Sequence, residues 1–511
     1  MSELKSIIIF HRKNMDWYNK IFVPYMREQY KTRFTIITNQ TLESISKKAW
    51  YSSDDVIINI ADIENKASNF SDYNEQDIYN SAREYEKKYN VTYMRDVFQQ
   101  DRGVSLHMLG SYSKRPGSNR KGRSLLELTN MENYYYNFFE KHISQYKVDL
   151  VIARPDDMMG FSITSIAKFN NIASTIQQTT RINGYMYWAY GPYSGDKQIK
   201  LKAEKIDFNS LNIEIKNSDV NSEIASHAIK YNKIHLDRLS FKATLQGVIY
   251  TLKDRLNWLI KDIKRGKIGE RVPMIPKILS KINTHRDHRY YQKIFNSNIE
   301  EIVKGSYIYF PLPMEPEYAT HSLSKNFNNV HAIVQQAALC MPAGYKLVVK
   351  EHSPNIGLKS RAFYTSLMKL PNVVMANYFI KGQDLIDKAE SVMTFIGSTA
   401  VEAGERGKMA ILFGDSVEFM YLPHILLAHS MRDLPEVISK SIEIVSESEK
   451  QNIKEAFYIY KKAFKEIGYY APDTPLFDGT SDIIKRDDFL VSINQLIDLC
   501  NIQRSNKISH S

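Results

Sequence analysis

The most informative motif is FIGSTAVEAGERGK, residues 395–408. A predicted strand ends just before Gly397, which allows a sharp turn, and Ser398 and Thr399 begin a predicted helix. The free N–H groups and positive dipole end of a helix start suit a phosphate or a carboxylate, and the two hydroxyls add donors. Thr399 and Glu402 also have the spacing of a capping box, which needs no ligand. We keep both interpretations, because a capped helix still has N–H groups for an anion.

A second motif, KLVVKEHSPNIG at residues 346–357, places Lys350, Glu351 and His352 directly after a predicted buried strand. A cation and an imidazole at a strand end could face the phosphate of a leaving group. His352 could also protonate that group, since imidazole titrates near neutral pH. The alternative is a surface Lys–Glu pair with a histidine that fills a turn.

The third motif is YIYFPLPMEPE, residues 307–317, in which a β-branched and aromatic run ends in three prolines and two carboxylates. Proline fixes φ, so Pro311, Pro313 and Pro316 predict a stiff loop that could form the wall of a base or sugar site. Glu315 could contact ribose hydroxyls or act as a base. The alternative is a proline-rich turn with solvated carboxylates.

Two carboxylates also follow a predicted strand in VIARPDDMMG, residues 151–160. Asp156 and Asp157 are adjacent and do not form the spaced Asp-x-Asp pattern that holds a divalent ion, so we predict no metal site. Either carboxylate could accept a proton from an acceptor hydroxyl or attack an anomeric carbon. A turn-forming role after proline is equally consistent with the sequence.

Three further residues could hold the carboxylate of an acidic acceptor or sugar. His11 and Arg12 follow the first predicted strand, and Arg181 lies in QQTTRINGYMYW. Guanidinium groups bind carboxylates well because two parallel N–H donors match the two oxygens.

These motifs follow short apolar runs that alternate with predicted helices. Runs at 5–10, 34–38, 55–60 and 149–154 form one group, and runs at 306–310, 345–350, 372–376, 391–396 and 409–414 form another. Continuous apolar strands that alternate with helices, such as 329–339 and 360–369, predict parallel sheets covered on both faces. Ligands of such sheets bind beyond the carboxyl ends of the strands.

The chain of 511 residues is too long for one core, and its composition is that of a globular soluble protein. Its two cysteines favour a reducing compartment over a disulfide framework. The N-terminal apolar run is too short for a bilayer span and precedes its cations, unlike a signal peptide. The expected location is therefore cytoplasmic.

The net charge of +11 comes from one segment. Residues 230–295 contain 16 Lys or Arg and 5 Asp or Glu, a net charge equal to that of the whole chain. Apolar residues from Leu245 to Ile263 recur there at helical spacing. The segment is either a helix packed on its own protein with a solvated cationic face or a peripheral contact with the inner face of the plasma membrane. Because no nucleic-acid-binding motif accompanies the charge, we predict no nucleic-acid partner.

The predicted domains are a Rossmann-like lobe (1–205), a basic helical linker (206–302), a second Rossmann-like lobe (303–435), and C-terminal helices with a tail (436–511). The predicted fold class is α/β with two Rossmann-like lobes.

The motif order FPL-x-x-E-P-E (310–317), KEH-x-P (350–354) and GST-x-x-EA (397–403) resembles the bacterial capsule polysaccharide biosynthesis proteins that include the capsular β-Kdo transferases. The resemblance covers mainly residues 307–419. It implies a GT-B-like fold in which the two lobes face a cleft, with residues 1–205 as the acceptor lobe and residues 303–435 as the nucleotide-sugar lobe. It also implies a GT-B glycosyltransferase that uses a CMP-linked ulosonic acid and acts in the cytoplasm on a membrane-anchored acceptor. It places Lys350, His352, Ser398, Thr399 and Glu402 around the nucleotide, with Glu315 and its prolines in the cleft wall. Pro313 stands where the family often has histidine.

We therefore expect a metal-independent glycosyltransferase of surface polysaccharide biosynthesis that needs no cofactor besides its nucleotide-sugar donor. Its expected partners are a glycan or glycolipid acceptor and a capsule-assembly complex. The alternatives are a non-catalytic assembly partner, or a GT-B relative that transfers polyol phosphate or epimerises a sugar.

Overall fold

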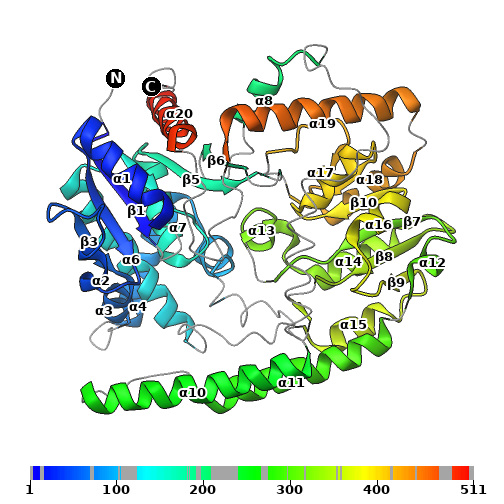
Figure 1. Cartoon of the computed structure of the whole chain (residues 1–511), viewed down its shortest axis with the longest axis horizontal. Helices are drawn as coiled ribbons and strands as arrows, with labels where there is room; N and C mark the ends of the chain where they lie inside the picture. The colour runs from blue at the N-terminus through cyan, green and yellow to red at the C-terminus, as the bar shows by residue number, and fades with distance from the viewer. Residues whose placement is uncertain are drawn as a thin grey trace.

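The structure is a computed structural model with two α/β lobes side by side (Figure 1). It describes residues 4–11, 16–68, 74–101, 104, 123–180, 182, 185–190, 197–208, 240–265, 274–295, 297–315, 318–352, 355–356, 359–414, 418–443, 446–470 and 486–505. Two of the predicted site residues, Arg12 and Arg181, lie outside these ranges.

The first lobe is built on a seven-stranded sheet of order β13-β6-β5-β4-β1-β2-β3. Five strands are parallel: β1 (Ser6–His11), β2 (Arg33–Thr38), β3 (Val56–Asn59), β4 (Leu150–Ile152) and β5 (Ala173–Thr179). Two antiparallel strands, β6 (Tyr185–Tyr190) and β13 (Tyr469–Tyr470), extend the sheet at one edge. The chain order reverses between β1 and β4, so this is the point where a doubly wound sheet opens a crevice at its carboxyl edge.

Helices cover both faces of this sheet. They are α1 (Asp16–Tyr30), α2 (Leu42–Ser46), α3 (Ile60–Ala67), α4 (Glu75–Tyr89), η2 (Tyr93–Phe98), α6 (Leu125–Tyr146), α7 (Met158–Phe169), α8 (Lys197–Ala203) and α20 (Arg486–Ser505). Consecutive strand residues point to opposite faces, so Ile7 and Ile9 join the core beside α1 and α20, while Ile8 joins the core beside α6 and α7.

The second lobe has a six-stranded, all-parallel sheet of order β12-β11-β10-β7-β8-β9. The strands are β7 (Tyr307–Pro311), β8 (Lys346–Lys350), β9 (Val373–Met375), β10 (Ser391–Thr394), β11 (Ala410–Leu412) and β12 (Ile425–Leu427). From β7 the chain fills one side of the sheet with β8 and β9 and then the other side with β10 to β12. The order reverses between β7 and β10.

The helices of this lobe are α12 (Ile299–Ile302), α13 (Tyr318–His321), η4 (Lys325–Phe327), α14 (Val330–Leu339), α15 (Arg361–Leu367), α16 (Gly382–Lys388), α17 (Ser398–Glu405), η6 (Met431–Asp433), α18 (Leu434–Ser441) and α19 (Glu447–Ile467). Tyr307 and Tyr309 point to the face covered by α16, α17 and α19, and Ile308 and Phe310 point to the opposite face. Both faces are dry cores, which is why these strands are apolar throughout.

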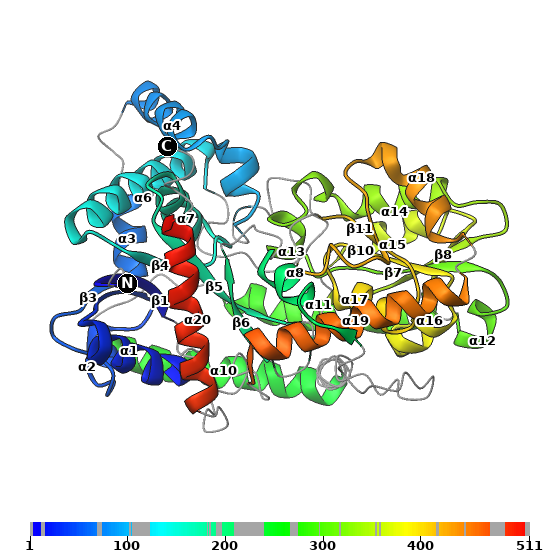
Figure 2. The same ribbon diagram turned by 90° about the horizontal axis from the view of Figure 1, so that it is seen from above.

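The lobes are connected by packing as well as by the chain. One hydrophobic cluster contains Ile176 and Tyr187 of the first sheet together with Phe464 of α19. The predicted C-terminal region, 436–511, contributes to both lobes: α19 packs on α8 and α17, while β13 and α20 return to the first sheet (Figure 2). Helices α10 (Phe241–Arg265) and α11 (Met274–Ile294) form a hairpin along the outside of the molecule (Figure 1).

The expectation of two parallel α/β sheets is confirmed, and the architecture is that of a GT-B-like fold with two Rossmann-like lobes. Every predicted strand exists, with ends that differ by at most two residues. The predictions missed β5, β6, β12 and β13. No helix within the described residues is long and apolar enough to cross a bilayer.

Candidate functional site

The three motifs of the second lobe lie together at one edge of its sheet. Neighbouring strands β8, β7 and β10 are parallel, so the loops after Lys350, Pro311 and Thr394 leave the same edge. The loop after β7 is joined to the end of β8 by a hydrogen bond from the Leu312 N–H to the Lys350 carbonyl, at 2.9 Å. The order reversal between β7 and β10 places the crevice typical of such sheets at this point.

Lys350 is a buried cation at this edge, with 7% of its surface exposed. None of the described residues forms a hydrogen bond or an ion pair with its Nζ atom. Burial lowers the pKa of Lys350 to about 8, and the adjacent Glu351 carboxylate acts in the opposite direction. Burial of an ammonium group without an anionic partner destabilises the folded chain, and an anionic ligand would offset that cost.

The alternation of side chains along β8 shows which face of the sheet Lys350 occupies. Val348 belongs to the core beside α16 and α17, while Leu347 and Val349 belong to the opposite core. Lys350 therefore lies on the Val348 face. The same face carries Ile396, which directly precedes the turn into α17. Lys350 and the first turn of α17 are thus on one side of the sheet edge.

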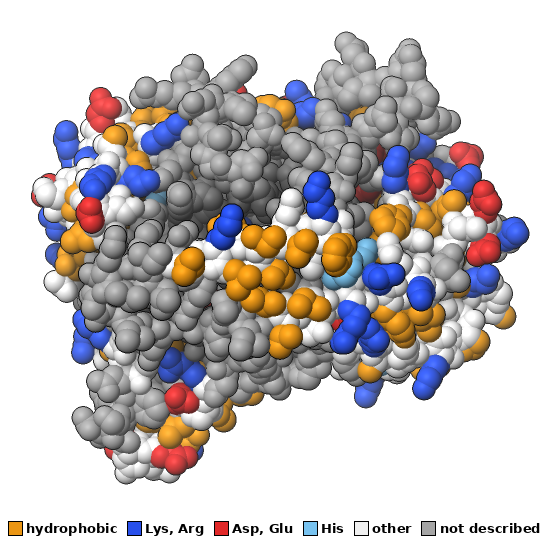
Figure 3. Space-filling view, turned by 60° about the horizontal axis from the view of Figure 1, so that its bottom comes forward, with side chains coloured by type: hydrophobic (Ala, Val, Ile, Leu, Met, Phe, Trp, Pro, Cys, Tyr) orange, Lys and Arg blue, Asp and Glu red, His pale blue; other side chains and the backbone are white. Residues whose placement is uncertain are grey.

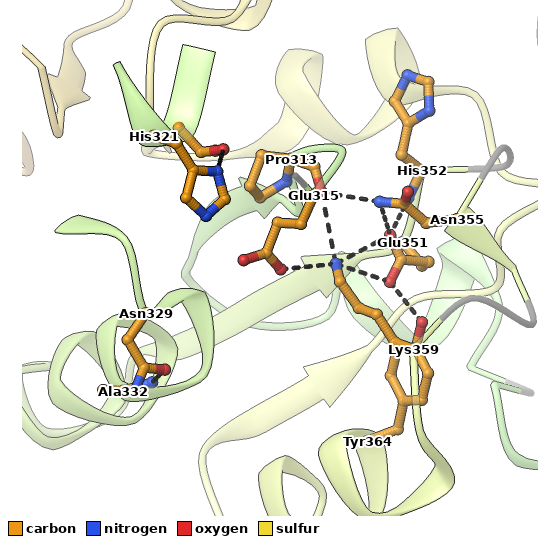
Figure 4. Close-up of polar contacts among 11 residues, drawn as sticks. Pro313, Glu315, His321, Asn329, Ala332, Glu351, His352, Asn355, Lys359 and Tyr364 are labelled. Carbon is orange, nitrogen blue, oxygen red and sulfur yellow. Dashed lines mark hydrogen bonds and ion pairs between the residues drawn. The ribbon is translucent and has the colours of Figure 1, made fainter. Parts of the chain in front are cut away.

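Glu351 points to the other face and organises the loop after β8 (Figure 4). It is fully buried and accepts hydrogen bonds from the Tyr364 hydroxyl, from Asn355 Nδ2 at 3.2 Å and from Lys359 Nζ at 3.1 Å. It also accepts from the backbone N–H of His352 at 2.7 Å. The alternative of a surface Lys–Glu pair is wrong, because both Lys350 and Glu351 are buried and Glu351 pairs with Lys359.

The same cluster holds the proline-rich loop in place. The Pro313 carbonyl accepts from Asn355 Nδ2 at 2.8 Å and from Lys359 Nζ at 3.4 Å. Lys359 Nζ also lies 3.6 Å from a carboxylate oxygen of Glu315. Lys359 therefore connects the loop after β7 with the loop after β8. Proline residues and buried charge pairs together make a rigid wall at this edge.

Glu315 differs from the solvated carboxylate of the alternative interpretation. Its side chain is only 12% exposed. Burial raises its pKa, Lys359 opposes that change, and the Glu351 carboxylate adds to it. A carboxyl group with a raised pKa is suited to donate or accept a proton near neutral pH.

His352 is half-buried, and its imidazole extends away from the Glu351–Lys359 cluster (Figure 4). The backbone N–H of His352 donates to Glu351, so the buried Glu351–Lys359 pair helps to fix the position of the imidazole. His321, at the end of α13, is buried and its Nδ1 lies 2.9 Å from the Thr320 hydroxyl.

Helix α17 begins at Ser398, and Gly397 is its N-cap residue without a side-chain hydrogen bond to the helix. The predicted capping box of Thr399 and Glu402 is wrong, because the helix begins one residue before Thr399. Glu402 instead accepts from the Ser398 hydroxyl at 3.1 Å and from Gln383 Nε2 at 3.1 Å. The Gly397 N-cap has no side chain to accept from the first N–H groups of α17, so it leaves these groups for another partner such as an anion.

Two residues explain the local shape of this turn. A Cβ on Gly397 would lie 2.7 Å from Thr394 Oγ1, so only glycine fits the turn without a shift. Glu402 is almost fully buried, and burial raises its pKa, while Gln383, Arg406 and Ser398 act in the opposite direction. Glu402 thus holds the Ser398 hydroxyl in place at the start of α17.

Asp156 and Asp157 lie after β4, at the order reversal of the first sheet. Asp157 is the N-cap of α7, and its Oδ1 accepts from the Gly160 N–H at 2.7 Å. This contact supports the turn-forming alternative for Asp157. Asp156 is half-buried beside it. Asp101, which the sequence interpretation missed, is buried and accepts from the Met158 N–H at 3.0 Å.

His11 ends β1, the strand next to β4. It is buried, its Nδ1 lies 2.7 Å from Asn19 Nδ2, and its ring contacts Trp50 edge-on. The loop that follows, with Arg12, lies outside the described residues, as does Arg181 after β5.

The carboxyl ends of the two sheets meet at one inter-lobe contact. Gln178, near the end of β5, lies 3.3 Å from the buried Glu418, which follows β11 (Nε2 to Oε2). This contact joins the end of β5 in the first lobe to the segment after β11 in the second lobe. In the described part of the chain, no three His, Cys, Asp or Glu side chains gather as a metal site would require.

The sequence interpretation did not select Lys359, Asn355 or Tyr364. In the sequence, Asn355 and Lys359 stand out only because each is next to an apolar residue in SPNIGLKSRAFY. That local pattern does not reveal which distant residue either side chain binds.

Comparisons with known proteins give structural likeness only. No family model matches the sequence, and no curated protein matches it. Among solved structures, a Staphylococcus aureus MnaA–UDP complex is 10% identical, with 91% of this chain and 95% of that chain covered and a TM-score of 0.28. The glycosyltransferase VinC with dTDP is 11% identical, with 97% and 99% covered and a TM-score of 0.27.

The Thermosulfurimonas dismutans KpsC β-Kdo 2,7 transferase is 13% identical, with 70% of this chain and 88% of that chain covered and a TM-score of 0.29. These values are too low to transfer a function, so the fold assignment rests on the two strand orders.

Proposed function

We propose that this chain is a GT-B glycosyltransferase that transfers a sugar from a nucleotide-activated donor to a surface-polysaccharide or glycolipid acceptor. The observation that carries the proposal is the buried Lys350, for which the described residues supply no hydrogen bond or ion pair to Nζ. It lies on the same side of the sheet edge as the start of α17, where the N-cap residue is a glycine, at the order reversal of the second sheet. A cation and free N–H groups on one side of a sheet edge suit the phosphate of a nucleotide.

In this proposal Lys350, the α17 N–H groups and the Ser398 hydroxyl bind the donor phosphate. They also stabilise the negative charge that develops there as the sugar departs. His352 emerges from the same edge and protonates or hydrogen-bonds the leaving phosphate. No metal is needed in this scheme, so activity in the presence of EDTA is expected.

The proton from the acceptor hydroxyl goes to a carboxylate. Glu315 is a candidate because its raised pKa suits proton transfer, and Asp156 is a candidate because it lies on the facing lobe. Asp157 remains a third candidate, although its carboxylate caps α7. Comparison of Glu315→Gln, Asp156→Asn and Asp157→Asn in donor turnover identifies which of them acts.

The leading donor is a CMP-linked ulosonic acid such as Kdo, which the resemblance to the capsular β-Kdo transferases supports. His11 ends β1, and Arg12 and Arg181 follow β1 and β5 in the sequence. These three residues are proposed to hold the carboxylate of the sugar or the acceptor.

The first experiment measures thermal stabilisation by CMP, UDP and GDP, because a ligand that binds only the folded chain raises its melting temperature. CMP should stabilise the protein, and Ser398→Ala and His352→Ala should reduce that effect. Unchanged stabilisation in both variants would overturn this site assignment.

The second experiment follows the fate of CMP-, UDP- and GDP-sugars. Release of nucleotide with transfer to an acceptor supports a glycosyltransferase. Conversion of a nucleotide sugar without an acceptor would indicate an epimerase, and transfer of a polyol phosphate would indicate the other enzyme alternative. Nucleotide binding and turnover would both be absent in a non-catalytic assembly partner.

A further inference from the structure

Helix α10 exposes an apolar stripe. Phe241, Leu245, Ile249, Leu252 and Leu256 recur at spacings of three and four residues, which places them on one side of the helix. Their exposed fractions run from 44% for Ile249 and Leu252 to 69% for Phe241. The apolar side of an amphipathic helix normally packs on the core, but here it faces outward.

Helix α11 continues this surface. The ring of Phe241 lies 5.8 Å from the ring of His285, so the start of α10 packs beside the middle of α11. Leu279 and Ile282 of α11 are about half exposed. Figure 3 shows apolar side chains gathered on this face, with Lys and Arg side chains at its border. We call these seven apolar residues of α10 and α11, together with Tyr250, the hairpin surface.

The hairpin is strongly cationic. By sequence, α10 carries 6 Lys or Arg and 2 Asp, and α11 carries 5 Lys or Arg and 1 Asp. The acidic residue of α11, Asp287, is buried and paired with Arg361 at 2.9 Å, so it does not offset the surface charge. Among the basic residues, Lys242, Lys253, Arg286 and Arg289 are exposed.

The end of α11 is anchored to the second lobe. Tyr291 and Phe295 are fully buried and contact Tyr364, and the Tyr291 hydroxyl donates to the Lys359 carbonyl at 3.1 Å. Lys359 belongs to the cluster behind the candidate site. The hairpin surface therefore has a defined orientation relative to the catalytic lobe.

We propose that the hairpin surface binds the interface of an anionic lipid bilayer, with α10 lying in the membrane plane. Apolar side chains would enter the boundary between headgroups and acyl chains, while the surrounding Lys and Arg contact anionic headgroups. This inference does not depend on the identity of the sugar donor or on catalysis.

The charge argues against the other occupants. A two-fold dimer through the same surface would place two strongly cationic hairpins face to face, which mutual repulsion disfavours. Nucleic acid would match the charge but would leave aliphatic Leu and Ile side chains against phosphates. A bilayer with anionic headgroups complements both the charge and the apolar stripe.

The test is co-sedimentation of the full chain with vesicles of phosphatidylcholine alone and of phosphatidylcholine mixed equally with phosphatidylglycerol. We expect binding to the anionic vesicles, weaker binding in high salt, and little binding to phosphatidylcholine alone. The combined variant Leu245→Ser, Ile249→Ser, Leu252→Ser should lower the partition coefficient at least about tenfold, because three apolar side chains no longer enter the interface.

A matched control replaces three apolar side chains that are similarly exposed elsewhere, Leu42→Ser, Leu201→Ser and Leu339→Ser. It should bind vesicles like the wild type. The charge variant Lys242→Gln, Lys253→Gln should weaken binding by about fivefold per residue removed. All the substituted side chains are exposed, so the melting temperature should stay close to that of the wild type.

Three results would overturn the proposal: no binding of the wild type to anionic vesicles, equal loss in the matched control, or a wild-type dimer in light scattering that the stripe variant converts to monomer. CMP-induced stabilisation is measured without vesicles. If CMP did not stabilise the protein, the proposed function would be refuted, and the result of the vesicle experiment would still stand.

Discussion

Replacement of Lys350 by methionine tests the candidate site most directly. Methionine keeps an unbranched stem and removes the charge. If Lys350 is kept for a ligand, its loss should stabilise the free protein and weaken nucleotide binding. A residue that served only the fold would show the opposite effect on stability.

The size of the effect follows from burial. The pKa of Lys350 falls from 10.5 to about 8 in the folded chain. Each pKa unit corresponds to about 1.4 kcal/mol, so the buried charge lowers the free energy of unfolding by about 3 kcal/mol at pH 7. Between about pH 8 and 10.5 the unfolded chain binds more protons than the folded chain, so wild-type stability rises with pH in that interval.

The assay is urea unfolding followed by circular dichroism at pH 7 and at pH 10, with and without CMP. At pH 7, Lys350→Met should be more stable than the wild type by up to about 3 kcal/mol, and the difference should shrink at pH 10. CMP-induced stabilisation should decrease, with an affinity loss of about tenfold or more.

Lys346→Met is the matched control. Lys346 begins the same strand that Lys350 ends, and it is exposed. This variant should alter neither the stability nor the response to CMP. Destabilisation by Lys350→Met at pH 7, or a normal response of that variant to CMP, would refute the assignment of Lys350 as a buried ligand-binding cation.

Three other variants test the structure around the site. Glu351→Gln should lower the free energy of unfolding by about 3 kcal/mol, because it leaves Lys359 buried with only the more distant Glu315; a loss below about 1 kcal/mol in urea would contradict the buried pair. Gly160→Ala should destabilise by about 3 kcal/mol, since its Cβ would lie 2.2 Å from the Arg154 carbonyl, whereas Gly305→Ala, with no atom within 4 Å, should be neutral by thermal melting. Burial lowers the pKa of His424 to about 4, so the unfolded chain binds a proton first as the pH falls from about 6.5 to 4, and stability should drop by up to about 3 kcal/mol. His424→Gln should flatten that part of a stability–pH curve, and an unchanged slope would show that His424 is not its cause.

The strands could be predicted because both faces of each sheet are buried. Runs such as KSIIIF and YKLVVK have a continuous apolar centre (IIIF and LVV), and that pattern is local in the sequence. Two of the missed strands, β5 and β13, lack this signal, whereas β6 (YMYWAY) and β12 (ILL) carry it and were overlooked. β5 carries the polar residues Gln177 and Gln178 just before its last residue, Thr179, and β13 is a pair of tyrosines at an edge. Pairing with β4 and β6, not composition, makes them strands.

The site was predictable only in part for the same reason. Lys350, Glu315 and Ser398 were selected because they follow apolar runs, and strand ends are where parallel sheets bind ligands. The capping-box prediction was wrong because α17 begins at Ser398, so Thr399 lies within the first turn and Glu402 accepts from the Ser398 hydroxyl and from Gln383. When several partners lie within reach of a side chain, the tertiary geometry decides which of them it binds. The spacing of residues in the sequence does not specify that geometry.

The sequence by itself determined the α/β class, the positions of most strands and the concentration of positive charge in residues 230–295, because these depend on periodicity and composition. Tertiary structure alone decided that Lys350 is buried with no ion-pair partner in the described part of the chain, that Glu351 pairs with Lys359, and that the apolar side of α10 faces outward. Burial and pairing depend on residues far apart in the chain. The free energy of a charge depends on what surrounds it after folding, and no local pattern specifies that environment.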